Sequence, residues 1–427
     1  MPQHIPALRR HVPLRGFVRV CSPLLLAFVC STAVAQSSPY FIGLSQTLGH
    51  DSNLLRLGRE ETAPVGFTKQ DNYSTTTLLA GFNQGIGRQR VSANASLRDT
   101  RYDRNSVFNN QGYSLRGALD WSTVERLSGA VNFSANRSLQ RFGSEEVGFL
   151  REKNLETVQT LSARAVLGLV TRYSLEISGG HTGVRNSLQQ PGVQAREFEQ
   201  DNAAIGLRWS PSSFTSLGVT AGVTQGRYPK FRNSPDGFVA DRFKRDDIGV
   251  TANHRFSGAS SVEVRISDSN TVYDLNAQRN FKGLTGYLGW TWQPTSKLVF
   301  VSSARRDTGQ ESYATAVFTL PAIADYSREN TVMRISTDYN FSAKVTFNSS
   351  LVYYRSSIVR TIDNPFLPLE AEGRDKVTQL SLGARWAPVR SVLAGCDLSS
   401  EDRRAEGALV VSLRGTTFSC YGQLSLQ

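Results

Sequence analysis

The feature that most constrains this chain is an alternation of apolar and polar residues, repeated along nearly all of the sequence after residue 36. Residues 91–98, 113–121 and 127–134 alternate in this way, and residues 284–292 and 380–386 repeat the pattern much later. Successive side chains of a β-strand point to opposite faces, so each segment is predicted to be a strand with one apolar and one polar face. The chain shows almost no helical period, and an all-β fold is expected.

A soluble β-sandwich would also alternate, but three features favour a membrane barrel. Most segments run for about 9–13 residues, whereas sandwich strands are nearer five or six. Their polar faces carry small residues and arginine, which suits a wet interior. The connections are alternately short and long, as in outer-membrane barrels, which have short periplasmic turns and long extracellular loops.

Short connections are expected near 85–89, 122–126, 171–172, 210–213, 257–260, 293–296, 342–344 and 388–390. Long connections are expected near 50–71, 102–111, 140–154, 184–198, 227–242, 273–281, 308–328, 356–375 and 402–414. Together they join about eighteen strands, an even number that places both termini on the periplasmic side. Residues 36–427 are therefore predicted to form a transmembrane antiparallel up-and-down β-barrel, closed so that no strand edge meets lipid.

Tryptophan supplies an independent argument for the barrel. Each tryptophan precedes an expected short turn, where headgroup-level aromatic residues form the periplasmic girdle of such barrels. A soluble core would scatter its tryptophans along the strands. The predicted girdle is Trp121, Trp209, Trp290, Trp292 and Trp386.

The N-terminus predicts export. Residues 1–20 carry four arginines and no acid, and an apolar run at 24–30 precedes Ala33-Val34-Ala35, a small-x-small cleavage pattern. Residues 1–35 are predicted to be a secretory signal peptide. A membrane anchor is the alternative, but the apolar run is too short for a spanning helix, which needs about 20 residues.

The net charge of the chain excludes few classes of protein. The formal net charge of the 427-residue chain is +12, and loss of the four signal-peptide arginines leaves +8. An exported chain without a block of lysine or arginine gives no reason to expect nucleic acid as a partner. No run after residue 35 is long and apolar enough to form a membrane helix.

The polar phase of the strands predicts the lining of the lumen. Arginine outnumbers acid there by about two to one, a charge bias that favours anionic or highly hydroxylated solutes. The alternative is that arginine and acid pair across strands and only fill the interior. The predicted lining includes Arg98, Arg116, Asp120, Arg164, Glu176, Arg208, Arg265, Arg334, Asp338 and Arg385.

Two expected loops contain apolar stretches, at residues 316–323 and 364–369. Either could fold inward as a constriction, or the loops could pack on one another. The lumen is therefore open or plugged, and the sequence leaves both states available.

No catalytic arrangement emerges from the sequence. The predicted mature chain has His50, His181 and His254, and serine is so abundant that a chance Ser–His pair has little weight. No nucleophile-elbow, metal-ligand or phosphate-loop pattern occurs, so no enzyme, metal or cofactor is expected. Asp51 and Asn53 could offer oxygens to Ca²⁺, but two ligands are a weak signal.

The cysteine pattern predicts one disulfide. Cys21 and Cys30 leave with the signal peptide, and Cys396 and Cys420 remain in an oxidising compartment. Both lie on the apolar phase of the last two expected strands, at similar heights, where opposed residues of antiparallel strands come within disulfide range. The alternative is two free cysteines that serve as small lipid-facing residues.

Two short stretches carry a family resemblance. The run GHDSNLLRL at residues 49–57 is similar to the signature at the start of EpsL-type exopolysaccharide-biosynthesis proteins of the outer membrane, within a β-barrel porin group. In this chain Ser52 replaces the second acid of that signature and Leu55 replaces the aromatic residue. The ending CYGQLSLQ at 420–427 also resembles the close of that family. The resemblance implies a role in making or exporting exopolysaccharide, as in a biofilm matrix, and it brings no catalytic residues.

The sequence thus predicts a barrel in the outer membrane of a Gram-negative bacterium that serves as a channel or scaffold for exopolysaccharide export. A general small-solute porin is the main alternative, and an outer-membrane lipid hydrolase or a surface adhesion scaffold is a further one. The expected partners are outer-membrane lipid, polysaccharide including acidic polysaccharide, the barrel-assembly machinery and periplasmic components of polysaccharide export.

Overall fold

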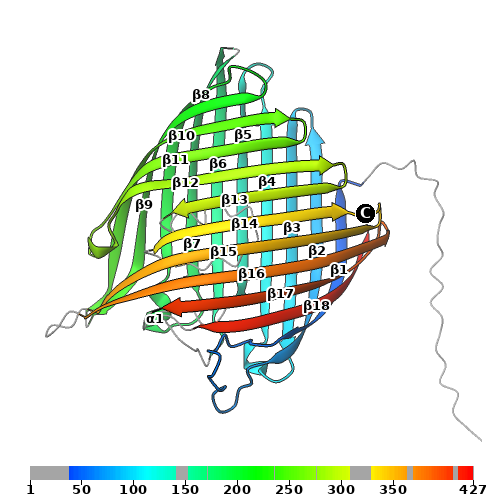
Figure 1. Ribbon diagram of the computed structural model, residues 1–427, viewed down its shortest axis with the longest axis vertical. Helices are drawn as coiled ribbons and strands as arrows, with labels where there is room; N and C mark the ends of the chain where they lie inside the picture. The colour runs from blue at the N-terminus through cyan, green and yellow to red at the C-terminus, as the bar shows by residue number, and fades with distance from the viewer. Residues whose placement is uncertain are drawn as a thin grey trace, which may run out of the picture. The chain divides into compact units, whose positions relative to one another are not determined.

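In the computed structural model, the described part of the chain forms one antiparallel sheet of eighteen strands that closes on itself (Figure 1). The structure describes residues 38–140, 152–170, 172–234, 236–275, 277–307, 328–362, 369–406 and 412–426. The predicted signal peptide, the apolar stretch at 316–323 and most of that at 364–369 lie outside the described residues. The predictions made for those segments therefore remain predictions.

The first nine strands are β1 (Tyr40–Asp51), β2 (Asp71–Ile86), β3 (Gln89–Tyr102), β4 (Asn110–Ser122), β5 (Leu127–Leu139), β6 (Leu155–Val170), β7 (Tyr173–Asn186), β8 (Phe198–Trp209) and β9 (Thr215–Ser234). The second nine are β10 (Gly237–Ser257), β11 (Ser260–Tyr273), β12 (Phe281–Thr295), β13 (Leu298–Asp307), β14 (Arg328–Asn340), β15 (Val345–Ile362), β16 (Leu369–Val389), β17 (Val392–Glu406) and β18 (Leu413–Leu426). Short helices lie in three connections: η1 (Ser106–Phe108), α1 (Pro191–Gln194) and η2 (Ala277–Arg279). No helix in the described segments has the length and apolar character needed to cross a membrane.

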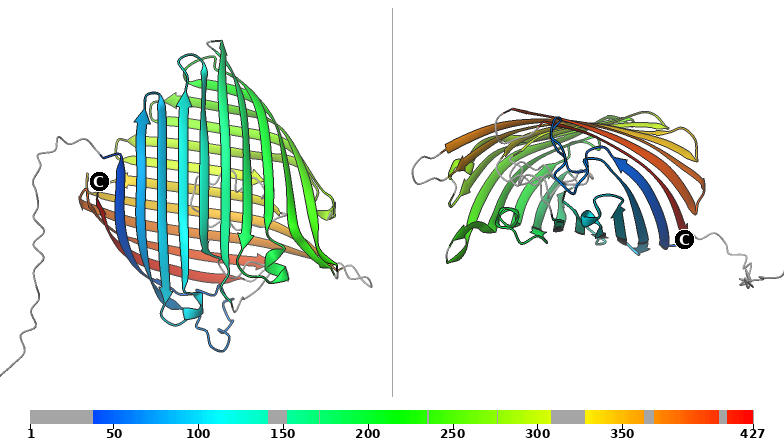
Figure 2. Two further views of the ribbon diagram at one scale, coloured as in Figure 1. Left: turned by 180° about the vertical axis from the view of Figure 1, so that it is seen from behind. Right: turned by 90° about the horizontal axis from the view of Figure 1, so that it is seen from below.

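Each strand pairs with its neighbours in the sequence, and β1 closes the barrel by pairing with β18. Figure 2 shows β1 to β9 side by side on the wall that lies behind in Figure 1. At the seam, Ile42 lies opposite Leu426 and Asp51 lies opposite Thr417. The start of β1 and the end of β18 therefore lie at the same end of the barrel, as predicted from an even number of strands.

The connections at this end are short. The turn between β2 and β3 consists of Gly87 and Arg88, and Gly87 has φ +61°, a conformation that suits glycine at the first position of a two-residue hairpin turn. At the opposite end the connections are longer, for example 52–70 between β1 and β2 and 187–197 between β7 and β8.

The predicted lengths of two extracellular loops are wrong. The expected loops at 227–242 and 356–375 are largely strand, because β9 and β10 continue to Ser234 and Gly237, and β15 and β16 continue to Ile362 and Leu369. Paired backbone continues beyond the region where alternating hydrophobicity marks the wall, because a hairpin satisfies its backbone hydrogen bonds in water as well as in lipid. The sequence pattern records the height of the apolar band and not the full length of the strands.

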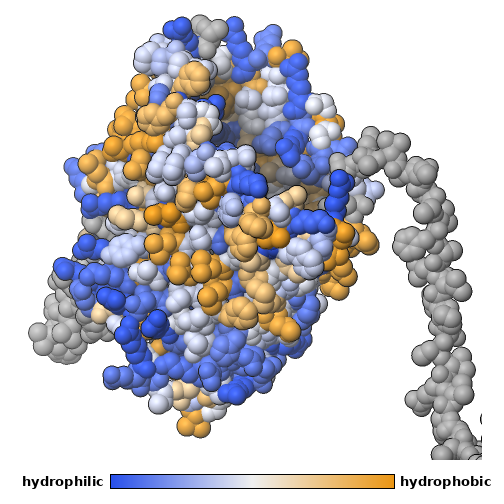
Figure 3. Space-filling model, turned by 45° about the vertical axis from the view of Figure 1, so that its right-hand side comes forward, coloured by the Kyte–Doolittle hydropathy of each residue, from blue (hydrophilic) through white to orange (hydrophobic). Residues whose placement is uncertain are grey.

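The two faces of the sheet differ as the alternation predicts. Large apolar side chains are exposed on one phase of every strand except β13, as with Leu44 on β1, Ile248 on β10 and Leu382 on β16. Orange side chains gather across the middle of the outer face in Figure 3, and blue side chains cover its lower end. A closed sheet with an apolar outer face satisfies every wall hydrogen bond internally, which is the condition for spanning lipid.

Fully buried apolar residues gather at the loop end. One cluster comprises Leu55, Leu57 and Phe108, contributed by the first two long connections. The other comprises Val184, Phe198, Tyr228, Phe243 and Tyr273 from β7 to β11. Among the described residues, the buried apolar side chains thus form two separate clusters where loops meet the wall, and not one continuous core.

Candidate functional site: the lumenal face and the loop end

The ten predicted lining residues all lie on the sheet face opposite to the exposed apolar side chains. On β4, for example, Arg116 and Asp120 alternate with the exposed Leu115 and Leu119. On β16, Arg385 alternates with Leu380 and Leu382. Because opposed residues of paired strands share a face, the register carries this inner phase around the whole wall.

Glu176 on β7 brings two of the predicted arginines together. Its carboxylate lies 2.5 Å from Arg164 Nε on β6 and accepts a hydrogen bond of 2.9 Å from Arg208 Nη2 on β8. All three side chains remain partly exposed. One carboxylate between two guanidinium groups leaves this stretch of the inner wall with a surplus of positive charge.

A second group of arginines lies on β3 and β4. Arg98 Nη2 donates to Asn136 Oδ1 at 3.1 Å, a neutral partner on β5. Arg116 lies opposite Asn94 and Ser134, and it forms no ion pair with any described residue. This part of the inner face therefore offers guanidinium groups to solvent.

The remaining predicted lining residues are more dispersed. Arg265 Nη2 lies 3.8 Å from Glu263 of its own strand, and both side chains are nearly half exposed. Asp338 on β14 lies opposite Val299 and Asn348, and Asp120 lies opposite Arg90. Arg334 lies on the same inner phase of β14 as Asp338.

Arg385 borders a hollow of about 360 Å³ on the inner wall near the seam. Its surroundings include Tyr421, close enough to interact with the guanidinium group, and Asp397. The hollow thus combines a cation, a phenol ring, hydroxyls and an amide. It is lined by Ser45, Thr77, Leu79, Arg385, Leu393, Tyr421 and Gln423.

Sequence reasoning missed a buried charge cluster higher on the inner wall. Arg245 on β10 is fully buried, and its guanidinium group lies 2.8 Å from Asp247 and 2.9 Å from Asp307. Arg305 also pairs with Asp307, at 2.7 Å, and Ser269 accepts a hydrogen bond from Arg245. The polar phase of residues 248–256, extended backward along the chain, would have placed Arg245 and Asp247 on the inner face.

A second missed pair lies on β16 and β17, within sequence that had been predicted as loop. Arg403 donates from Nε and Nη2 to both carboxylate oxygens of Asp375, at 2.7 to 3.0 Å. Both side chains are buried. A bidentate, buried pair of this kind fixes the geometry of the wall and leaves little charge for a solute.

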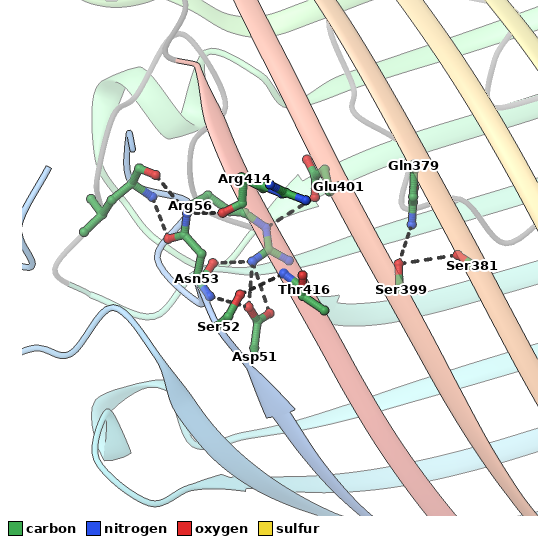
Figure 4. A network of polar contacts seen from close by, with 11 residues as sticks. Asp51, Ser52, Asn53, Arg56, Gln379, Ser381, Ser399, Glu401, Arg414 and Thr416 are labelled. Atoms are coloured by element: carbon green, nitrogen blue, oxygen red, sulfur yellow. Dashed lines mark hydrogen bonds and ion pairs between the residues drawn. The ribbon is translucent and has the colours of Figure 1, made fainter. Parts of the chain in front are cut away.

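The run at 49–57 folds into a polar latch across the closing seam (Figure 4). Asn53 is buried, its amide donates to the carbonyls of Leu57 and Arg414, and its Oδ1 accepts from Leu57 N. Ser52 and Thr416 exchange two hydrogen bonds, Ser52 N to the Thr416 carbonyl and Thr416 N to Ser52 Oγ. The latch therefore ties the first loop to β18.

Arg56 completes the latch. Its Nη1 lies 2.9 Å from Asp51 Oδ1 and its Nε lies 3.5 Å from Glu401 on β17. Burial alone would lower the pKa of Arg56, but the two carboxylates outweigh it and the pKa lies above its ordinary value. Arg56 also has φ +52°, a left-handed conformation that non-glycine residues rarely adopt. Asp51 and Asn53 are thus occupied within the protein.

The predicted girdle residues lie on the outer phase near the short turns. Trp209, Trp290, Trp292 and Trp386 are all exposed. Trp290 and Trp292 stack with ring centroids 5.7 Å apart, and Trp292 stacks on Phe300 at 5.4 Å. Trp121 lies over Gly129, where an added Cβ would come within 2.6 Å of the indole. Glycine on β5 thus makes room for the ring.

The two remaining cysteines lie opposite each other on β17 and β18. The structure joins Cys396 and Cys420 by a disulfide, on the outer phase that also carries Leu398 and Phe418. Their position next to the seam is the one expected from the sequence.

The histidines lie apart from one another on the outer phase of the wall. His50 hydrogen-bonds Asn72, His181 hydrogen-bonds Asp201, and His254 hydrogen-bonds Thr215. His254 also packs edge-on against Phe256 near a short turn. No group of three or more potential metal ligands occurs among the described residues.

These observations define the class. The chain forms a closed, eighteen-stranded antiparallel barrel with an apolar outer face, a girdle of tryptophans and a polar interior, which is the architecture of a Gram-negative outer-membrane β-barrel.

No protein-family model matches the chain, and no curated protein matches it. Among solved structures, it is similar to OpdK of Pseudomonas aeruginosa with vanillate, with 10% identity, coverage of 91% of this chain and 99% of that chain, and a TM-score of 0.45. It is also similar to OccK3 (OpdO) of the same species, with 13% identity, 91% and 95% coverage and a TM-score of 0.44. The FrpB iron transporter of Neisseria meningitidis matches with 11% identity, 85% and 62% coverage and a TM-score of 0.45. Because these identities and TM-scores are low, the assignment to the class of outer-membrane barrels rests on the strands of this chain itself.

Proposed function

We propose that this barrel is an outer-membrane channel for acidic or highly hydroxylated saccharides and that it serves exopolysaccharide export. The observation that carries the proposal is the inner face of the wall below the loop end. Arg98 and Arg116 have no carboxylate partner among the described residues, and Arg164 and Arg208 share Glu176. Positive rings in a water-filled lumen favour anionic solutes over cations.

The chemistry of the inner wall supports a saccharide over a simple ion. The hollow beside Arg385 adds Ser45, Thr77, Tyr421 and Gln423, groups that can donate to and accept from sugar hydroxyls. Tyr421 also supplies a flat face for a sugar ring. The resemblance of residues 49–57 to the start of EpsL-type proteins is a further, independent support for an exopolysaccharide.

In this proposal the arginines act as a series of weak sites. A carboxylate or sulfate group would exchange water for a guanidinium group at one height and pass to the next, while hydroxyls hydrogen-bond to the wall. Such passage needs attraction strong enough for entry and weak enough for release. Partly exposed and shared guanidinium groups, as at Glu176, meet that requirement better than buried pairs do. Periplasmic export components would deliver the polymer to the short-turn end.

A general small-solute porin is the second candidate. The same inner face would serve small anions, and the two proposals differ in whether a polymer enters. A lipid hydrolase has less support, since the hydrogen-bond partners of His50, His181 and His254 are Asn72, Asp201 and Thr215.

Single-channel recording in planar bilayers tests the proposal. An acidic oligosaccharide should interrupt the current at lower concentration than a neutral oligosaccharide of equal length. Equal block by both oligosaccharides would show that the arginines do not favour acidic saccharides. A conducting pore that neither saccharide blocks would favour the small-solute porin. Deletion of the gene should reduce surface polysaccharide and leave uptake of small solutes unchanged.

A further inference from the structure

Two aromatic side chains on the inner wall near the seam each lie opposite a glycine of the neighbouring strand. Phe41 on β1 pairs in register with Gly81 on β2, and Tyr421 on β18 pairs in register with Gly395 on β17. A Cβ added to Gly395 would lie 2.7 Å from the Tyr421 hydroxyl, and one added to Gly81 would clash with the Phe41 ring. A side chain that reaches the neighbouring strand, about 4.8 Å away, lies along the wall. Each ring therefore turns one face toward the backbone and the other toward the lumen.

The two rings near the seam are not enclosed. Phe41 and Tyr421 are half-buried. Phe243 at the loop end also lies opposite a glycine, Gly226, but it is only 3% exposed and belongs to a hydrophobic cluster. The same aromatic–glycine pairing thus occurs in two settings. At the loop end it fills a core, and near the seam it leaves a ring surface that a solute can reach.

The hollow beside Arg385 lies along the wall between these two rings. Tyr421 lines the hollow and lies opposite Thr47 on β1, six residues from Phe41 on the same strand. At about 3.3 Å per residue, the two positions are roughly 20 Å apart along the strand. Ser45 lies between them on the inner phase of β1 and also lines the hollow. The hollow, of about 360 Å³, therefore extends from Tyr421 toward Phe41.

The other groups that line the hollow suit the two sides of a sugar ring. Leu79 and Leu393 add apolar surface, and Ser45, Thr77 and Gln423 offer hydroxyl and amide groups. A pyranose ring carries C–H bonds on its faces and hydroxyls around its edge. The C–H bonds can pack on an aromatic ring, whose faces carry partial negative charge, while the hydroxyls meet the polar groups. Sites for small ligands commonly combine apolar walls with a few polar groups in this way.

The hollow does not depend on charge alone. Arg385 is the one charged side chain among the described residues that line it. Asp397 lies close enough to interact with this guanidinium group, and so does the Tyr421 hydroxyl. A solute therefore meets a partly compensated cation here, whereas contact with a ring face needs no charge on the solute.

We propose that Tyr421 and Phe41 are stacking residues for uncharged sugar rings and that the hollow between them is a saccharide subsite near the periplasmic end of the lumen. The inference rests on the proposed function, and it adds that the polymer carries neutral sugar units beside its acidic groups. Phe41 is the second residue of β1, so a chain that enters from the short-turn end meets its ring before that of Tyr421.

Block of the single-channel current by maltohexaose, a neutral oligosaccharide, tests this subsite. Tyr421→Leu keeps an apolar side chain but removes the flat ring, and the concentration for half-maximal block should rise about tenfold. Tyr421→Phe keeps the ring without its hydroxyl and should change that concentration by less than about twofold. A poly(ethylene glycol) of equal mass has no sugar ring and should block the wild type and Tyr421→Leu alike.

Tyr73→Leu is the matched control. Tyr73 on β2 lies opposite Gly49 on β1, and its ring fills the space above that glycine in the same way. It lies at the loop end against Tyr102, with ring centroids 6.1 Å apart, and does not line the hollow. Its loss removes an equivalent aromatic–glycine contact and should leave block by maltohexaose unchanged.

Failure of maltohexaose to block the wild type would overturn the subsite, as would equal block of the wild type and Tyr421→Leu. Equal losses in Tyr421→Leu and Tyr73→Leu would show a general effect of sheet packing and also overturn it. A loss of the same size for poly(ethylene glycol) would show a change of pore shape, with the same consequence.

Folding of each variant is checked by the shift in gel migration on heating. If Tyr421→Leu does not fold, Phe41→Leu is measured in the same way, with an expected rise of about threefold, and no change would overturn the subsite. The proposed function fails separately, when an acidic oligosaccharide of equal length blocks the wild type no better than maltohexaose does.

Discussion

The inner wall below the loop end and the loop end itself use the same residue types in opposite ways. Below the loop end, Arg116 has no acidic partner among the described residues, and Arg164 and Arg208 share one carboxylate while partly exposed. At the loop end, Arg245 and Arg403 are buried and held by carboxylates. A buried charge must be paired because an unpaired charge in the protein interior is costly. An exposed guanidinium group, in contrast, stays available to a solute. We therefore expect the buried pairs to contribute to stability and the exposed arginines to contribute to the selection of solutes.

The largest expected effect is at the loop end. Asp307→Asn would remove one of the carboxylates that hold the buried Arg245, and the free energy of unfolding should fall by about 3–5 kcal/mol. Urea unfolding in lipid vesicles, followed by tryptophan fluorescence, measures it. Glu263→Gln is the matched control, because it breaks an exposed pair with Arg265 and should cost about 0–1 kcal/mol. Equal losses would erase the distinction between the two regions.

The disulfide should have the next largest effect. Cys396 and Cys420 are separated by 24 residues, and in the chain-entropy account a bridge of that span contributes about 3 kcal/mol. Replacement of both by serine should lower stability by about that amount and leave ion selectivity unchanged. Mass spectrometry of unreduced protein from membranes should detect no free thiol, and two alkylatable thiols would contradict the bridge.

Disruption of the latch should have the third largest effect on stability. Asn53→Ala leaves the Leu57 and Arg414 backbone groups unsatisfied in a buried place, at a cost of about 1–3 kcal/mol. Hydrogen exchange should show faster opening of β1 against β18 and little change on β10 to β12. Gln46→Ala, on the exposed face of β1, is the control. Uniform acceleration around the barrel would mean that the latch does not act on the seam.

The smallest effect on stability and the largest on passage are expected in the lumen. Arg385→Gln should leave the urea midpoint within error and weaken block by an acidic oligosaccharide about three- to tenfold, the loss of one charged hydrogen-bond donor. Block by a neutral oligosaccharide should change little. A loss that is equal for both saccharides would point to a change of shape at the hollow.

The wall of the barrel could be predicted from the sequence because lipid enforces it. Alternation, turn position and the tryptophans all record the apolar band, so strand number, termini and inner phase follow from residues such as Leu115 and Arg116. The loop end could not be predicted in the same way, since water there can satisfy the backbone hydrogen bonds of any conformation. The extension of β9 and β10 toward Ser234 and Gly237 leaves no periodic apolar signal.

The buried charges were missed for a related reason. Arg245 and Asp307 are about 60 residues apart in sequence and meet only through the register of four strands. The signature at 49–57 was visible as a motif, but its role depends on Arg414 and Thr416 at the far end of the chain. The local pattern predicts the face of the sheet on which a residue lies. Its role depends on the residues that it meets on nearby strands.

The reversal potential of the wild-type channel in a potassium chloride gradient tests the central claim most directly. Because Arg98, Arg116, Arg164 and Arg208 outweigh Glu176 on the inner wall, we expect chloride to permeate in preference to potassium. Replacement of these four arginines by glutamine should move the reversal potential toward zero. A wild-type pore that prefers potassium would contradict the assignment of the lumenal arginines to the selection of anionic solutes.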